Sequence, residues 1–153
     1  MAEPLGRTGA AAPPDRLVTL GALRELALLG LSALLFALSF PSFLSSSGWF
    51  PLGFVSLAPL FLAVRSASWP RCLLWGPLTG FVSYALFNFW LAKFNPVTIF
   101  VVPPIHAAYV LALLTALKAA VSLFPRAGFA VQPLVWVGYE YLKIQGFLGY
   151  PWG

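Results

Sequence analysis

The chain has 153 residues, of which 60% are hydrophobic and only 8% are charged. A soluble globular domain carries about 25% charged residues, so this composition excludes a soluble fold and predicts a protein embedded in a lipid bilayer. The apolar segments are long and continuous rather than alternating, which favours membrane-spanning helices over a β-barrel. The predicted fold class is therefore an all-α membrane protein.

The formal net charge is +5, from nine basic and four acidic residues. The basic residues lie between the apolar segments and no nucleic-acid-binding motif accompanies them, so we expect them to orient helices and expect no nucleic-acid partner. With one cysteine and one histidine, the sequence offers no disulfide within the chain and no set of zinc ligands. We expect no metal and no cofactor.

The first residues, 1–16, are small, polar and rich in proline and glycine, which predicts a disordered cytoplasmic tail. A secretory signal peptide is the alternative, because Arg7, Arg16 and Arg24 precede an apolar stretch. The chain stays hydrophobic afterwards, however, and no cleavage site with small residues follows Phe40. A protein with several membrane-spanning helices is the preferred interpretation.

The segment Leu26–Val64 contains no charged residue and is too long for one membrane crossing, for which about 20 residues suffice. Proline, serine and glycine at 41–51 predict a turn in its middle, and thus a helical hairpin. We expect the first helix at about Leu17–Phe40 and the second at about Pro51–Val64. Pro51 suits the first helical turn, where its missing N–H is not needed.

Three more helices are expected after the hairpin. Their approximate bounds are, in chain order, Cys72–Ala92, Pro104–Leu123 and Phe129–Lys143. The connector before the fourth helix contains Pro96, Pro103 and Pro104. Because proline lacks an N–H and restricts the preceding residue, these prolines should prevent that helix from starting before about Pro104.

The basic residues predict how these five helices are oriented. If successive connections lie alternately on the two sides of the membrane, seven basic residues fall on one side: Arg7, Arg16, Arg24, Arg65, Arg71, Lys118 and Arg126. Only Lys93 and Lys143 fall on the other. This asymmetry predicts a cytoplasmic amino terminus, and five helices then place Gly153 on the outer face.

Glu140 is the ionisable residue of most interest. The uncharged segment Ala127–Tyr139 precedes it, which is about 20 Å of helix against a hydrocarbon core of about 30 Å. The carboxylate should therefore lie in the outer leaflet or at its boundary, facing other helices, where ionisable groups are often functional. An interfacial pair with Lys143, three residues on, is an equal alternative.

His106 and Cys72 are weaker candidates. His106, at the outer start of the fourth helix, is either a proton carrier or, more commonly for a lone interfacial histidine, a hydrogen-bonding cap. Cys72, at the cytoplasmic end of the third helix, is either a palmitoylation site or a small apolar residue, and the second interpretation is preferred. The sequence shows no nucleophile–base pair.

Three stretches of the sequence together carry a family resemblance. They are LSFPSFLSSSGWFPLGFVSLAPLFLAV at 38–64, GFVSYALFNFWL at 80–91 and YEYLKIQGFLGYPWG at 139–153. In this order they resemble bacterial apolipoprotein N-acyltransferases, and the resemblance covers residues 17–153. Tyr150 replaces the family's usual phenylalanine and Lys143 its usual arginine.

The resemblance implies an enzyme of the bacterial inner membrane that moves an acyl chain from a phospholipid to the free amine of a lipoprotein's diacylglyceryl-cysteine. In the family, a Glu-Lys-Cys triad in a nitrilase-like domain outside the membrane forms a thioester intermediate. This chain contains none of that domain, and Cys72 lies on the predicted cytoplasmic side. We therefore expect the chain to be an amino-terminal part of the enzyme and inactive alone, with further helices and the catalytic domain after Gly153.

The resemblance also leads to a site hypothesis. The last residues would form an outer-face turn beneath the catalytic domain, made by Tyr150, Pro151, Trp152 and Gly153. Trp152 would lie at headgroup depth and Glu140 would anchor the turn from the helix below. The alternative for Trp152 is an ordinary residue of the interfacial aromatic belt.

Two other functions stay open from the sequence. One is a non-enzymatic membrane module, such as a transporter subunit or assembly partner, because proline-broken helices like the one near 95–104 occur at transporter sites. Transporters usually also show an internal repeat, and none is found in these five helices. The other is an inactive, truncated product.

Overall fold

The computed structural model describes residues 14–39, 47–87, 93 and 95–145, and the regular structure in these ranges is entirely helical. Its helices are α1 (Pro14–Ser39), α2 (Pro51–Ser66), α3 (Trp69–Phe87), α4 (Thr98–Leu123) and α5 (Gly128–Lys143). The predicted all-α fold is confirmed for these residues. Residues 14–16 of the predicted tail belong to α1, which begins with a proline as helices readily do, and residues 1–13 lie outside the described part.

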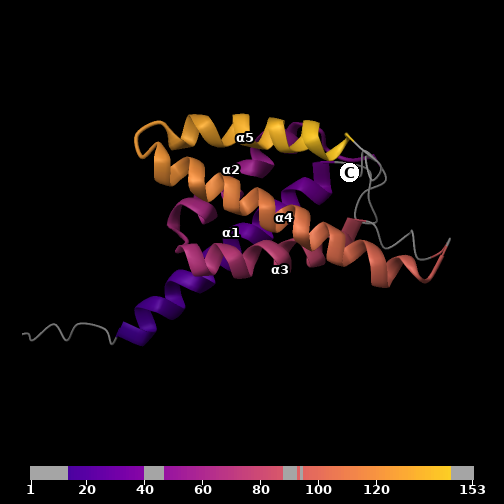
Figure 1. Ribbon diagram of the computed structural model, residues 1–153, viewed down its shortest axis with the longest axis horizontal. Helices are drawn as coiled ribbons and strands as arrows, with labels where there is room; N and C mark the ends of the chain where they lie inside the picture. The colour runs from indigo at the N-terminus through magenta and orange to yellow at the C-terminus, as the bar shows by residue number, and fades with distance from the viewer. Residues whose placement is uncertain (1–13, 40–46, 88–92, 94, 146–153) are drawn as a thin grey trace, which may run out of the picture.

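The helices pack as two antiparallel pairs with a fifth helix on top (Figure 1). α1 packs mainly on α2, α3 packs mainly on α4, and α5 lies along α4. The pairs meet through contacts of α1 with α3 and of α2 with α4. The buried core between them is apolar and includes Leu29, Phe61, Leu114 and Leu117.

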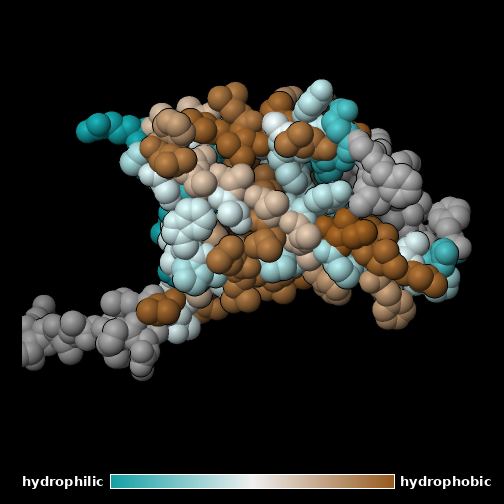
Figure 2. All heavy atoms as spheres, viewed as in Figure 1, coloured by the Kyte–Doolittle hydropathy of each residue, from teal (hydrophilic) through white to brown (hydrophobic). Residues whose placement is uncertain are grey.

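Two stretches among the described residues are long and apolar enough to cross a bilayer, Val18–Ser39 in α1 and Phe100–Leu123 in α4. α2 is apolar but shorter. Its 16 residues extend about 24 Å, which is less than the thickness of the hydrocarbon core, about 30 Å. Figure 2 shows that brown and pale side chains cover most of the visible face. Teal side chains gather at the α4–α5 loop and at the carboxyl end of α5. This distribution suits a bundle surrounded by lipid and wetted at its two ends.

The start of α4 differs from the prediction. The helix begins at Thr98, six residues before the expected start, and continues through Pro103 and Pro104. The prediction was wrong because two adjacent prolines remove only two helical hydrogen bonds, whereas the first turn is held independently. The carbonyl of Asn95 accepts hydrogen bonds from the Thr98 backbone N–H (3.0 Å) and hydroxyl (2.7 Å), and its side-chain oxygen accepts one from Val97 N–H (3.0 Å).

The other boundaries lie close to their predicted positions. α2 starts at Pro51 as expected, with the proline in the first turn. α3 starts at Trp69, three residues before the predicted start, and the part of the predicted third helix at 88–92 lies outside the described residues. α5 starts at Gly128, one residue before the predicted start, and ends at Lys143 as expected.

α3 and α4 approach each other along two glycines of α3. A Cβ atom added at Gly76 would lie 2.7 Å from the Cα of Leu111, and one added at Gly80 would lie 2.7 Å from the carbonyl oxygen of His106. Small residues four positions apart are typical of close helix contacts in membranes, because they let the backbones touch. The contact at Gly80 fixes the part of α4 that carries His106 against α3.

α2 is tied to its neighbours through its own backbone carbonyls. Ser32 of α1 donates a hydrogen bond to the carbonyl of Ser56 at 2.6 Å, and the buried amide of Gln132 of α5 donates one to the carbonyl of Phe61 at 3.3 Å. The ammonium of Lys118 of α4 lies 3.4 Å from the carbonyl of Val64, near the end of α2, where a cation is favourable. Side-chain hydrogen bonds between membrane helices contribute about 0.6 kcal/mol each, so these three contacts mainly fix the position of this short helix.

A buried ion pair joins α1 to α3 at the opposite end of the bundle from the carboxyl end of α5. Glu25 Oε1 lies 3.0 Å from an Arg71 Nη atom, and Glu25 Oε2 accepts a hydrogen bond from Trp75 Nε1 at 2.9 Å. The Glu25 side chain is only 2% exposed, whereas that of Arg71 is 29% exposed. The acid therefore depends on Arg71 and Trp75 for its compensation.

Candidate functional site

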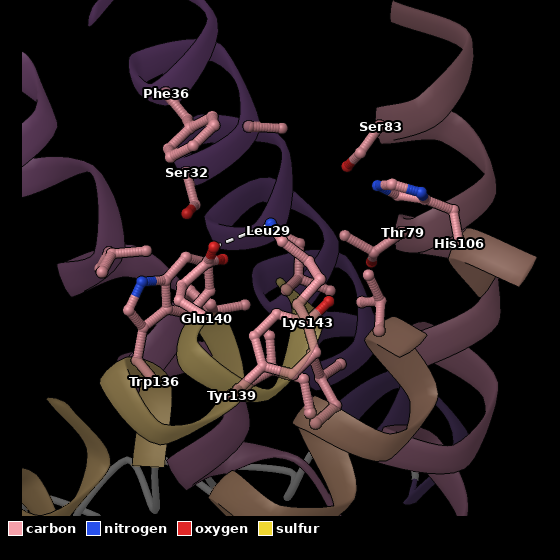
Figure 3. A pocket seen from close by; sticks show the side chains of 16 residues that line it. Leu29, Ser32, Phe36, Thr79, Ser83, His106, Trp136, Tyr139, Glu140 and Lys143 are labelled. Carbon is pink, nitrogen blue, oxygen red and sulfur yellow. Dashed lines mark ion pairs between the residues drawn. The ribbon is translucent and has the colours of Figure 1, made fainter. Parts of the chain in front are cut away.

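A cavity of about 120 Å³ lies between the five helices of the described part of the chain (Figure 3). Its apolar walls include Leu29, Phe36 and Leu114. Polar side chains from α1, α3, α4 and α5 also line it: Ser32, Thr79, Ser83, His106, Tyr139, Glu140 and Lys143. A single water needs about 10–15 Å³ of such space, so the cavity can accept a group considerably larger than water.

Two charged residues of α5 dominate the cavity. Lys143 Nζ lies 2.8 Å from Glu140 Oε2, so the pair expected from their spacing is present. The Lys143 side chain is only 10% exposed and that of Glu140 is 37% exposed, and both line the cavity. The pair is thus part of an internal polar site and is reachable from outside at Glu140.

Two aromatic rings of α5 flank this ion pair. The rings of Trp136 and Tyr139 lie 6.0 Å apart between centroids, and both line the cavity. The ammonium of Lys143 lies 5.8 Å from the Tyr139 ring centroid, within the range of a cation–π contact. The Lys143 ammonium in this site therefore has a carboxylate, that of Glu140, and an aromatic ring, that of Tyr139, as neighbours.

His106 lies across the cavity from these residues. It is the ninth residue of α4, and its ring lies 5.6 Å from that of Tyr84 of α3. The cap interpretation is wrong because α4 starts earlier than predicted and has Val97 at its N-cap position. In Figure 3, His106 and Ser83 lie on one side of the space that Glu140 and Lys143 enter from α5, and Ser32 and Phe36 lie on the other.

The structure supports the apolar interpretation of Cys72, which is 1% exposed and packs in the core near Val64 and Leu117. We therefore expect the thiol to resist a polar maleimide in the folded protein in detergent, and to react fully after denaturation. Mass spectrometry of the labelled chain measures this directly. Rapid labelling of the folded chain, at the rate of a small free thiol, would contradict the buried position.

The remaining predicted site residues, Tyr150, Pro151, Trp152 and Gly153, lie outside the described residues. The hypothesis that Glu140 anchors their turn therefore stays a prediction. Within the described ranges, no group of three or more histidine, cysteine, aspartate or glutamate residues is arranged to hold a metal ion.

Four buried or cavity-lining residues were not predicted from the sequence: Ser32, Thr79 and Ser83 in the cavity, and the buried acid Glu25. The spacing of Gly76 and Gly80 within an apolar stretch is a signal for the α3–α4 contact. Thr79 and Ser83 each lie three residues after one of these glycines, so they lie near the same face of the helix.

Comparison with known proteins identifies the family. Residues 32–153 match the profile of the apolipoprotein N-acyltransferase N-terminal domain. The chain belongs to this family. Among curated relatives, apolipoprotein N-acyltransferase 1 of Treponema pallidum is 46% identical over 131 residues, which cover 86% of this chain and 24% of the relative.

Two further relatives carry corresponding names. Apolipoprotein N-acyltransferase 1 of Treponema denticola is 38% identical over 123 residues, which cover 80% of this chain and 23% of the relative. The apolipoprotein N-acyltransferase of Borreliella burgdorferi is 30% identical over 128 residues, which cover 80% of this chain and 24% of the relative. The chain thus spans about a quarter of the length of these curated relatives. No solved structure matches it.

Proposed function

We propose that the chain is the membrane domain of an enzyme that transfers an acyl chain from a phospholipid to the amine of a lipoprotein's N-terminal diacylglyceryl-cysteine. The family match over residues 32–153 carries this proposal. The chain spans about a quarter of its relatives' length, and Cys72, the one cysteine in the sequence, is buried. In this proposal the catalytic groups belong to a region outside these 153 residues, and we expect the chain alone to be inactive.

The proposal includes five crossings of the bacterial inner membrane with the amino terminus in the cytoplasm. Arg65 and Arg71 near the α2–α3 connection, and Arg126 in the α4–α5 loop, support it because they share one end of the bundle (Figure 1). In this orientation the cavity opens in the outer half of the membrane. The short helices α2 and α5 then need local thinning of the bilayer.

The role of this domain is to hold the phospholipid donor within the outer leaflet and present it to the catalytic region. The cavity supports this role because it combines apolar walls with charged and hydroxyl side chains near one end of the bundle. Such a combination suits an amphiphile better than a purely polar or purely apolar ligand.

A chimera tests the proposed function. The segment of the Treponema pallidum relative that matches this chain would be replaced by the corresponding residues of this chain, and acyl transfer from a labelled phospholipid to a diacylglyceryl peptide would be measured. We expect the chimera to retain activity within about tenfold of the parent, and the 153-residue chain alone to show none.

Insertion and folding of the chimera are verified by its yield in the membrane and its melting temperature. An inactive chimera that inserts and melts like the parent would reject the proposed function. Acyl transfer by the isolated chain would reject the placement of catalysis outside it.

A further inference from the structure

We propose that the α4–α5 loop binds an anionic phospholipid at the end of the bundle that it shares with the α2–α3 connection. The lipid phosphate would pair with Arg126, and the start of an acyl chain would lie against Leu123 and Phe124. This site shares no residue with the cavity described above. Only its assignment to the cytoplasmic leaflet rests on the proposed function, through the orientation given there.

Basic side chains outnumber acidic ones at this end of the bundle. Among the described side chains here the acid is Glu25, which is buried and already paired with Arg71. Lys118 contacts the backbone carbonyl of Val64 at 3.4 Å rather than a carboxylate. Three further cations at this end are exposed and form no ion pair with another described side chain, so this end attracts anions. These cations are Arg24, Arg65 and Arg126.

An open hollow lies beside one of these cations. It is formed by the end of α4 and the loop that follows, and its lining combines Arg126 with apolar residues. The Leu123 side chain is 73% exposed and that of Phe124 is 51% exposed. Figure 2 shows hydrophilic and hydrophobic side chains directly next to each other at this loop. A guanidinium beside an apolar surface matches an amphiphile that carries a phosphate, because the guanidinium can bind two phosphate oxygens at once.

The loop that forms the hollow is held by its own backbone. Phe124 N–H donates a hydrogen bond to the carbonyl of Ala120 at 3.0 Å, and the carbonyl of Ala127 accepts hydrogen bonds from the first turn of α5. A Cβ atom added at Gly128 would lie 3.0 Å from the Cα of Val121, so the two helices are in close contact at the loop. Because the hollow is formed without a ligand, binding requires little additional ordering of the chain.

The surroundings favour a lipid over a soluble anion and an anionic headgroup over a zwitterionic one. Trp69, at the start of α3, is 42% exposed at the same end, and exposed tryptophan is typical of the headgroup region of a membrane. Basic residues at the cytoplasmic surface attract anionic lipids. A headgroup ammonium would instead meet an excess of cations here, with the Glu25 carboxylate already paired.

The test is competitive lipid retention by the purified 153-residue chain. The chain in detergent would be exposed to equal amounts of phosphatidylglycerol and phosphatidylcholine with the same acyl chains, and retained lipids would be counted by native mass spectrometry. We expect about tenfold preferential retention of phosphatidylglycerol, decreasing as salt is added before measurement. An excess of glycerol 3-phosphate should not displace the lipid, since it cannot occupy the apolar part of the hollow.

Variants of exposed residues assign this preference to the loop. Arg126→Gln should reduce it to less than about threefold, and Arg126→Lys should retain most of it, because lysine also pairs with phosphate. Phe124→Ser should lower retention of phosphatidylglycerol several-fold, because it removes apolar surface from the hollow. The matched control is Lys93→Gln, which removes an exposed cation from the opposite end of the bundle and should change nothing. Each variant must melt within a few degrees of the parent.

Equal retention of the two lipids by the parent chain would overturn the proposal, and so would an unchanged preference in Arg126→Gln. An equal loss in Lys93→Gln would also overturn it, because the preference would then reflect net charge alone. Displacement by glycerol 3-phosphate would show that the ligand is a free phosphate rather than a lipid. None of these outcomes affects the chimera experiment. An inactive chimera combined with an intact lipid preference would reject the proposed function and retain this site.

Discussion

Replacing Gly80 by leucine should force α3 away from α4 and strongly destabilise the bundle. A Cβ at this position would lie 2.7 Å from the carbonyl oxygen of His106 and 2.8 Å from the Cα of Ala107. Both are backbone atoms of a helix, so no side-chain rotation can relieve the overlap. Overpacking in a core destabilises by about 1–3 kcal/mol, and a leucine against backbone should reach or exceed the upper end of that range.

The measurement is thermal unfolding of the chain in detergent, where each kcal/mol corresponds to about 2–4 °C for a protein of this size. The matched control is Gly30→Leu in α1, because a Cβ there meets no atom within 4 Å. That substitution should leave the melting temperature unchanged or raise it, since leucine is a better helix former than glycine. Equal melting temperatures for Gly80→Leu and Gly30→Leu would show that α3 and α4 do not pack through Gly80.

The same contact links helix packing to the candidate site. Because the backbone of His106 touches Gly80, separation of the two helices would also move the imidazole relative to Ser83, and both residues line the cavity. A smaller change, Gly80→Ala, should therefore also shift the His106 side of the cavity, because its Cβ alone meets backbone atoms of α4. It alters the geometry of the cavity without altering any of its charged groups.

The order of the helices in the described ranges could be predicted from the sequence. Uninterrupted apolar runs separated by proline, glycine and charged residues made α1, α2 and α5 predictable within three residues of their observed bounds. The start of α4 was not predictable in this way. The rule that proline ends a helix does not account for the hydrogen bonds that Asn95 accepts from the first turn.

The cavity illustrates what sequence patterns leave open. The depth of Glu140 and its spacing from Lys143 were sufficient to single out this acid and its partner. That Ser32, Ser83 and His106 face the same space depends on how three other helices cross, and such crossings are set by side-chain packing over the whole bundle. The burial of Glu25 also depends on how the helices pack, because Trp75, which donates a hydrogen bond to it, lies 50 residues away in the sequence.

Replacing Arg71 by methionine should be the most destabilising removal of a charge in the described part of the chain. The substitution leaves the Glu25 carboxylate, with a side chain only 2% exposed, without its cation. Breaking a buried pair in this way costs about 3–5 kcal/mol, because the remaining charge is uncompensated. Glu25→Gln should cost less, since the Arg71 side chain is 29% exposed and can turn its charge toward water.

The double variant, Glu25→Gln with Arg71→Met, should recover most of the loss. It removes both charges, and the amide oxygen of glutamine can still accept the hydrogen bond from Trp75 Nε1. Replacing both members of a buried pair by neutral groups of similar size is often nearly neutral, unlike removal of one. The two single effects should therefore add to considerably more than the effect of the double variant, which is the signature of direct coupling.

Unfolding in detergent of the two single variants and the double variant measures this coupling, with Arg24→Met as the control. Arg24 neighbours Glu25 in sequence but is exposed, so its replacement should change stability by less than about 0.5 kcal/mol. If Arg71→Met and Arg24→Met had equal effects, the ion pair would contribute nothing to the joining of α1 and α3. If the two single effects simply added in the double variant, Glu25 and Arg71 would act independently. Either result would mean that apolar packing and the Trp75 hydrogen bond alone connect the helices at this end of the bundle.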